Sequence, residues 1–180
     1  MNSTGAFGWW SKANRKHRIR CLPRVMPSDP KFQAMRWLAQ RNLTVWEMRV
    51  RLEAQNFSPE SIGTVLDELD RLGYLNDRAV ADQIVRKSLT RREGPQRIVS
   101  RLRQRGVPPD LRDTVLNEVM AQVDWLEIAE LVRQRYDIGS PRGRARFIRH
   151  LAREGFPVGV IQQLADDGER GDHADGVKDY

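Results

Sequence analysis

The sequence has few of the residues on which most catalytic and metal-binding sites depend. Cys21 is the single cysteine among 180 residues, so no intramolecular disulfide can form, as is usual in a reducing cytosol. The three histidines are His17, His150 and His173, and none has metal-ligand spacing to a cysteine or another histidine. We therefore expect no metal site, no cofactor and no enzymatic activity.

Glycine-rich phosphate loops and long apolar runs are missing as well. Residues 139–143 contain two glycines, but they form neither a dinucleotide-binding fingerprint nor a Walker-type loop. No apolar run approaches the roughly 18 residues that a membrane-spanning helix needs. The basic N-terminal segment lacks the apolar stretch of a signal peptide. We expect a soluble, cytoplasmic protein without a membrane partner.

Positive charge is what the sequence has in excess. Lysine and arginine number 31 against 24 acidic residues, which gives a formal net charge of +7. Such a balance favours polyanionic partners. The charge is unevenly placed, because residues 1–27 hold six bases and no acid, whereas residues 166–180 hold six acids and two bases. We expect residues 1–27 to form a disordered basic arm and residues 168–180 a disordered acidic tail.

Two interpretations of the basic arm remain open. It is either an inert extension or an auxiliary nucleic-acid contact, in which Trp9 and Trp10 would stack on bases.

Helix-breaking residues divide the rest of the chain into segments of helical length. The intervals between them are about 10 to 20 residues, which is typical of helices. No window alternates Val, Ile and Thr with polar residues as a strand would. The pattern predicts an all-α protein. The breakers are Asn42, residues 56–59, Gly73, residues 94–95, 106–109, 139–141 and 155–157, and Gly168.

An internal repeat of about 50 residues becomes visible when the breakers are aligned. Residues 51–69 resemble residues 101–119 and, more loosely, residues 150–164. Each copy ends one helix, turns, inserts an apolar residue and begins the next helix near a proline. We therefore expect three helical repeats, at residues 28–73, 74–123 and 124–167, each with three helices.

The turn inside each repeat has a physical basis. Gly106 and Gly155 can adopt the left-handed conformation that ends a helix, and Asn56 is the next best residue for it. Ser58 can cap the following helix with Pro59 at its first position. Apolar residues three or four apart on both sides of the turns predict the core. They are Met48, Leu52, Ile62, Leu66, Leu69, Ile98, Leu102, Leu111, Val115, Val119, Phe147 and Leu151, with Phe57, Val107 and Phe156 after the turns.

Arginines recur at helical spacing in two regions. Residues 86–105 hold eight bases and one acid, and residues 133–153 hold seven arginines and one acid. Two stripes follow from the spacing: Arg97, Arg101 and Arg105 step by four, and Arg142, Arg146, Arg149 and Arg153 step by four, three and four. Each stripe therefore lies on one side of its helix, where like charges repel one another. A polyanion would relieve this repulsion and release counterions. The candidate binding residues are Arg86, Lys87, Arg91, Arg92, Arg97, Arg101, Arg105, Arg142, Arg146, Arg149 and Arg153.

The stripes have two interpretations. They are either solvated faces paired with acids elsewhere in the fold, or parts of a shared basic binding face, which we favour because they recur in equivalent helices. No base-reading motif is present, so sequence-specific binding is not expected.

Two segments resemble the signature of the RecX family. Residues 73–81 read Gly-Tyr-Leu-Asn-Asp-Arg-Ala-Val-Ala, similar to the family's Gly-Tyr-Leu-Asp-Asp element followed by an aromatic residue and alanine. Asn76 replaces its first aspartate and Val80 its aromatic residue, although Asn76 can still cap a helix. Residues 94–106 resemble the family's Gly-Pro-x-Arg-Ile element. With the opening helices near residues 36–52, the resemblance covers about residues 30–166.

The resemblance implies a fold and a function. The fold would be three tandem three-helix repeats in an elongated, curved, right-handed arrangement. The function would be regulation, mainly inhibition, of the RecA recombinase. A monomer would bind the RecA–single-stranded-DNA filament, block its extension or promote its disassembly, and so lower recombinase, ATPase and coprotease activity. Its DNA partner would be single-stranded DNA, with duplex DNA as a further candidate, bound without sequence specificity. Alternatives are a general, non-sequence-specific protein that binds DNA or RNA without a filament partner, and a helical adaptor for another acidic protein.

Overall fold

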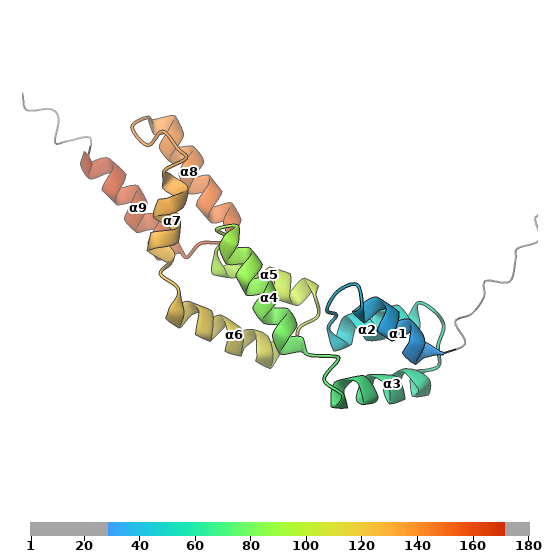
Figure 1. The fold of residues 1–180 in the computed structure, drawn as a ribbon. Coiled ribbons are helices and arrows are strands. Elements are labelled where there is room, and N and C mark those ends of the chain that lie inside the picture. Colours follow the sequence, from blue (N-terminus) through green and yellow to red (C-terminus); the bar gives the residue numbers. More distant parts are fainter. Residues whose placement is uncertain (1–28, 172–180) are drawn as a thin grey trace, which may run out of the picture.

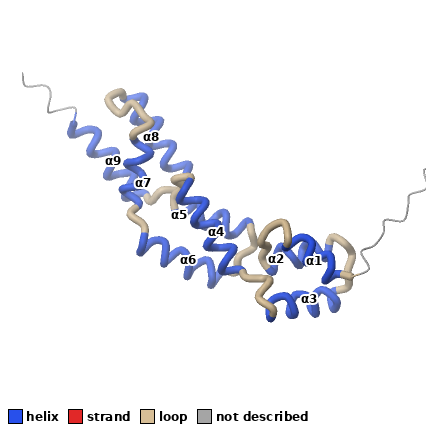
Figure 2. The backbone as a smooth tube through the Cα atoms, viewed as in Figure 1, coloured by secondary structure: helices blue, strands red, loops and turns tan. Residues whose placement is uncertain are grey.

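The computed structural model describes residues 29–171, and this part of the chain is built from helices joined by short loops (Figures 1 and 2). The predictions of a disordered arm at residues 1–27 and of the tail beyond residue 171 lie outside the described residues. No strand occurs within the described range, which confirms the all-α prediction. The helices are α1 (Pro30–Leu38), α2 (Val45–Glu53), α3 (Pro59–Arg71), α4 (Asp77–Thr90), α5 (Pro95–Gln104), α6 (Pro109–Gln122), α7 (Trp125–Arg133), α8 (Pro141–Glu154) and α9 (Val158–Gly171).

Local side-chain caps explain where several helices begin. Ser58 accepts a hydrogen bond from the Ser61 amide at 3.2 Å, with Pro59 at the first helical position, as the sequence predicts. Asn76 caps α4 by accepting from the Ala79 amide at 2.9 Å. Thr44 forms a reciprocal capping box with Glu47 at the start of α2. These bonds satisfy amides that have no partner inside the helix.

The turn in each repeat has the predicted left-handed geometry. The φ angle is 63° at Asn56, 68° at Gly106 and 81° at Gly155. The residue after each of them donates its amide to a leucine carbonyl five positions earlier, as in a Schellman motif. The three bonds run from Phe57 to Leu52 (3.4 Å), from Val107 to Leu102 (3.1 Å) and from Phe156 to Leu151 (3.1 Å). The apolar residue after the turn thereby folds back onto the helix that has just ended.

The buried apolar residues form two separate clusters. One lies within α1–α3 and includes Met48 and Leu52, both fully buried. The other runs through α4–α9, from Val80 through Leu102 to Leu164. The first repeat therefore has a core of its own, whereas the second and third repeats share one. The tandem arrangement is elongated, with α1–α3 at one end and α7–α9 at the other (Figure 1).

Neighbouring repeats meet through equivalent turns. The loop before α5 contacts the turn after α8, where Gly94 donates its amide to the Glu154 carbonyl at 2.8 Å. At the preceding junction, Thr44 in the loop before α2 donates its hydroxyl to the Arg105 carbonyl after α5 at 2.7 Å. In addition, the Val45 amide donates to Asp77 Oδ1 at 2.9 Å. Burial of that Asp77 carboxylate raises its pKa. The first junction is therefore largely polar.

One predicted helix end differs in the structure. Helix α9 continues through Gly168 and ends at Gly171, so Gly168 does not end the helix as the sequence predicted. A glycine inside a helix costs only about 1 kcal/mol relative to alanine, and it ends a helix only when the surrounding chain favours another conformation.

Candidate functional site

Arg101, in the α5 stripe, is held by a buried acid. Its guanidinium donates to both oxygens of Glu93, with Nε 2.7 Å from Oε2. Glu93 is only 5% exposed. Burial raises the pKa of Glu93, but the hydrogen bonds and charge of Arg101, helped by Ser88 and by the charge of Arg91, outweigh burial, so the pKa lies below its ordinary value. A bidentate pair of this kind fixes the orientation of the arginine side chain.

Arg105, one turn further along, connects two repeats. Its Nε lies 2.7 Å from Oε1 of Glu47 and its Nη2 lies 2.9 Å from Oε2, while Nη2 also donates to the Asn42 carbonyl at 3.0 Å. Burial raises the pKa of Glu47, but the hydrogen bonds from Arg105 and the Thr44 amide, with the charges of Arg105 and Arg41, outweigh burial, so the pKa lies below its ordinary value. Arg105 is therefore a structural link between repeats as well as a candidate binding residue.

Glu154 joins the two predicted arginine stripes end to end. Its Oε2 lies 3.9 Å from Nε of Arg97 in α5, and its Oε1 lies 3.2 Å from Nε of Arg153 in α8. The stripe on α5 thus meets the stripe on α8 at the junction between the second and third repeats. The structure brings these two sets together at one shared carboxylate, which spacing along the sequence does not reveal.

The other arginines of the α8 stripe are not paired. Arg142, Arg146 and Arg149 are exposed, and none forms an ion pair with another residue of the described chain. Arg153, at the end of the stripe, lies 2.9 Å from Nδ1 of His150. Burial lowers the pKa of His150, and the charge of Arg153 adds to this effect. The three unpaired arginines keep their full charge available for a partner.

Helix α4 supplies another group of exposed cations. Arg86, Lys87 and Arg91 are exposed and have no ion-pair partner among residues 29–171. Arg92, by contrast, is half-buried and donates to the Leu131 carbonyl at 3.2 Å. Arg92 therefore helps to hold α7 in place, and Lys87 and Arg91 are better suited to meet a ligand.

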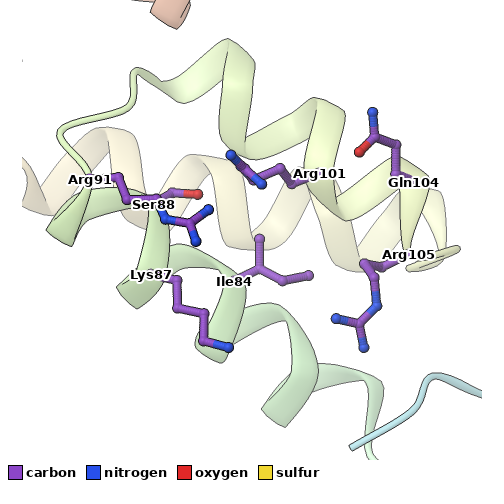
Figure 3. Close-up of a pocket in the computed structure, with 7 residues that line it drawn as sticks. All are labelled: Ile84, Lys87, Ser88, Arg91, Arg101, Gln104 and Arg105. Carbon is purple, nitrogen blue, oxygen red and sulfur yellow. The ribbon is translucent and has the colours of Figure 1, made fainter.

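A basic groove lies between α4 and α5 (Figure 3). It has a volume of about 260 Å³. Lys87 comes from α4, Arg91 from the turn directly after it and Arg101 from α5, so basic residues from two helices of the first predicted basic region, residues 86–105, face a common space. The groove is therefore suited to a phosphate or carboxylate group. Its lining residues are Ile84, Lys87, Ser88, Arg91, Arg101, Gln104 and Arg105.

Sequence reasoning missed Glu47 and Glu93, the two carboxylates that orient Arg105 and Arg101. Glu47 lies 58 residues from Arg105, and nothing in the local sequence indicates that the two meet. Glu93 is the single acid of its basic segment, and that isolation was the only available sign of a structural role.

Two further classes of site can be tested within the described chain. Between residues 29 and 171, no group of three or more His, Cys, Asp or Glu residues could hold a metal ion. No helix in that range is long and apolar enough to cross a membrane.

Comparison with known sequences identifies close relatives. Residues 76–116 match the family model described as RecX, second three-helix domain. The regulatory protein RecX of Halorhodospira halophila is 36% identical over 146 residues, which cover 77% of this chain and 89% of the relative. The protein of the same name from Thermus thermophilus is 33% identical over 135 residues, covering 75% of this chain and 89% of the relative.

Solved structures share the fold. The crystal structure of RecX from Lactobacillus salivarius superposes with a TM-score of 0.68 at 18% identity, covering 78% of this chain and 95% of that one. A second crystal structure of regulatory protein RecX has a TM-score of 0.65 at 21% identity, covering 76% and 71%. At these identities the likeness supports the architecture of tandem three-helix repeats.

Proposed function

Because this chain belongs to the RecX family of regulatory proteins, we propose that it regulates the RecA recombinase, mainly as an inhibitor. It binds the filament that RecA forms on single-stranded DNA and blocks extension of the filament or promotes its disassembly. Recombinase, ATPase and coprotease activities fall as a result. The proposal includes a monomeric protein that acts in the cytoplasm, without a cofactor and without catalytic activity of its own.

The observation that carries the proposal is the basic surface formed along α4, α5 and α8. The stripes on α5 and α8 meet at Glu154, and the groove between α4 and α5 adds Lys87 and Arg91. An elongated surface of this kind matches an elongated polyanion better than a small ligand. A nucleoprotein filament presents phosphates and protein carboxylates together, and arginine binds both through two parallel hydrogen bonds.

The unpaired arginines are the strongest candidates for direct contact. Arg142, Arg146 and Arg149 form no ion pair with a described residue, so a partner meets their charge without first displacing a paired acid. Arg101 and Arg105 would have to share their donors with Glu93 and Glu47. We therefore expect the α8 arginines to contribute more to affinity, per residue, than those of α5.

The test is RecA's single-stranded-DNA-dependent ATPase with substoichiometric amounts of this protein. We expect inhibition well below one protein per RecA, and loss of that inhibition when Arg142, Arg146 and Arg149 are all changed to Glu. The matched control changes Arg36, Arg49 and Arg71 to Glu, because these three are also exposed but lie in the first repeat. The control alters net charge equally and should still inhibit.

A general nucleic-acid-binding protein is the second candidate, favoured by the same unpaired cations. It predicts that inhibition appears only at amounts that coat the DNA, and that RecA does not raise affinity for DNA. Affinity would then depend steeply on salt, and removal of three phosphate contacts would lower that slope on single strands by about 2. An adaptor for an acidic protein would show little DNA affinity.

A further inference from the structure

Trp46 is an exposed aromatic residue at the junction between the first two repeats. It occupies the second position of α2 and is 50% exposed. One part of its indole, carbons Cγ, Cδ2 and Cε3, lies against Gly106 so closely that a Cβ atom there would overlap the ring. The next residue, Glu47, binds Arg105, and Arg105 lines the basic groove. The indole therefore packs on the turn that directly follows Arg105, the lining residue of the groove at the junction between the two repeats.

The equivalent junction shows that docking does not need an indole. There, Gly155 of the third repeat is covered by Gln96, whose Cβ would lie 3.0 Å from an added Cβ. Gln96 is the second residue of α5, as Trp46 is of α2. A glutamine therefore suffices to cover the glycine of the turn, and the additional exposed aromatic surface of Trp46 has no structural task at this position.

We propose that Trp46 and the groove between α4 and α5 together bind one or two nucleotides of single-stranded nucleic acid. The backbone phosphate lies in the groove and an unpaired base stacks on the exposed side of Trp46. This inference rests on the nucleic-acid part of the proposed function and extends it, because it assigns one part of the surface to the DNA strand. Base stacking on an aromatic side chain is tolerant of sequence.

The groove offers two kinds of side chain that can bind a phosphate. Lys87 and Arg91 are exposed and unpaired within the described structure, so they supply charge. Arg101 is held by Glu93 and Arg105 by Glu47, so both guanidinium groups are oriented before a ligand arrives. The Gln104 amide completes the lining. A duplex presents phosphates but no free base face, and the site therefore selects single strands through Trp46.

Fluorescence anisotropy with the full chain and no RecA tests the inference. The probes are labelled oligothymidylate, an abasic deoxyribose-phosphate strand of the same length and a duplex. For Trp46→Leu we expect about tenfold weaker binding of oligothymidylate, with no change for the abasic strand. Trp46→Phe should keep most of the affinity. Lys87→Glu with Arg91→Glu should weaken binding of every probe. Phe32→Leu, at an aromatic residue 62% exposed on α1, is the control and should bind like the unchanged protein.

Two results would overturn the inference. If Trp46→Leu lowers the affinity for oligothymidylate and for the abasic strand equally, the role of Trp46 is purely structural. If Trp46→Leu lowers the affinity for neither, the indole does not contact the strand. Failure of the proposed function is recognised separately. If binding depends on Trp46 but the unchanged protein does not inhibit RecA ATPase, the nucleotide site stands and RecA regulation fails. If RecA is inhibited but Trp46→Leu binds oligothymidylate normally, only the nucleotide site fails.

Discussion

Gly155 provides a quantitative test of how the repeats dock. Its φ of +81° is a conformation that costs an L-residue roughly 1–2 kcal/mol. A Cβ atom at this position would also lie 2.8 Å from the backbone nitrogen of Arg97 and 3.0 Å from Cβ of Gln96. Both atoms belong to the start of α5, so the two repeats would have to separate. Overpacking of this kind costs about 1–3 kcal/mol, and Gly155→Ala should therefore destabilise the protein by about 2–5 kcal/mol.

Two other glycines separate the backbone term from the docking term. Gly73 has a similar φ of +74° but nothing within 4 Å of an added Cβ, so Gly73→Ala should cost only the backbone term, roughly 1–2 kcal/mol. Gly63 lies inside α3 with open space around it, and Gly63→Ala should stabilise by about 0.5–1 kcal/mol. Urea unfolding followed by far-ultraviolet circular dichroism measures all three. Equal costs at Gly155 and Gly73 would show that the junction is not closely packed.

Other consequences concern the cores and the ion pairs. Leu52→Ala and Leu102→Ala each remove a fully buried side chain and should each lower the free energy of unfolding by about 2–5 kcal/mol. Because the two clusters are separate, amide hydrogen exchange should accelerate in α1–α3 for Leu52→Ala and in α4–α9 for Leu102→Ala. Uniform acceleration would contradict this division. Since the folded-state pKa of Glu93 lies below the ordinary value of 4.5, its charge adds stability above that pH, and the added stability is lost as pH falls through the lower folded value. Glu93→Gln should therefore destabilise at neutral pH and flatten the acid limb of a stability–pH profile, whereas an unchanged limb would remove Glu93 as a contributor. Arg78→Ala should have little effect on stability, because its pair with Glu118 is exposed. A clear drop in the thermal unfolding midpoint would show instead that this pair holds α4 to α6.

The repeat and its turns could be read from the sequence because their causes are local. Asn56, Gly106 and Gly155 each end a helix within a few residues of the leucine whose carbonyl the turn satisfies. Spacings of three and four residues likewise place an apolar stripe on one helix face without knowledge of the rest of the fold. The family resemblance rests on short segments of the same kind. The helix end predicted at Gly168 is wrong, because a glycine alone does not show whether a helix will end there.

Contacts between distant residues were decided only by the tertiary structure. The ion pair of Arg105 with Glu47 spans 58 residues, the shared carboxylate of Glu154 joins α5 to α8, and Trp46 covers a glycine of the next repeat. The division into one separate and one shared core has the same origin. The sequence determined the helices, their buried faces and the overall charge, since those depend on neighbours within one or two turns. Which arginines are held by acids and which remain available depends on how repeats dock, and only the folded chain sets that.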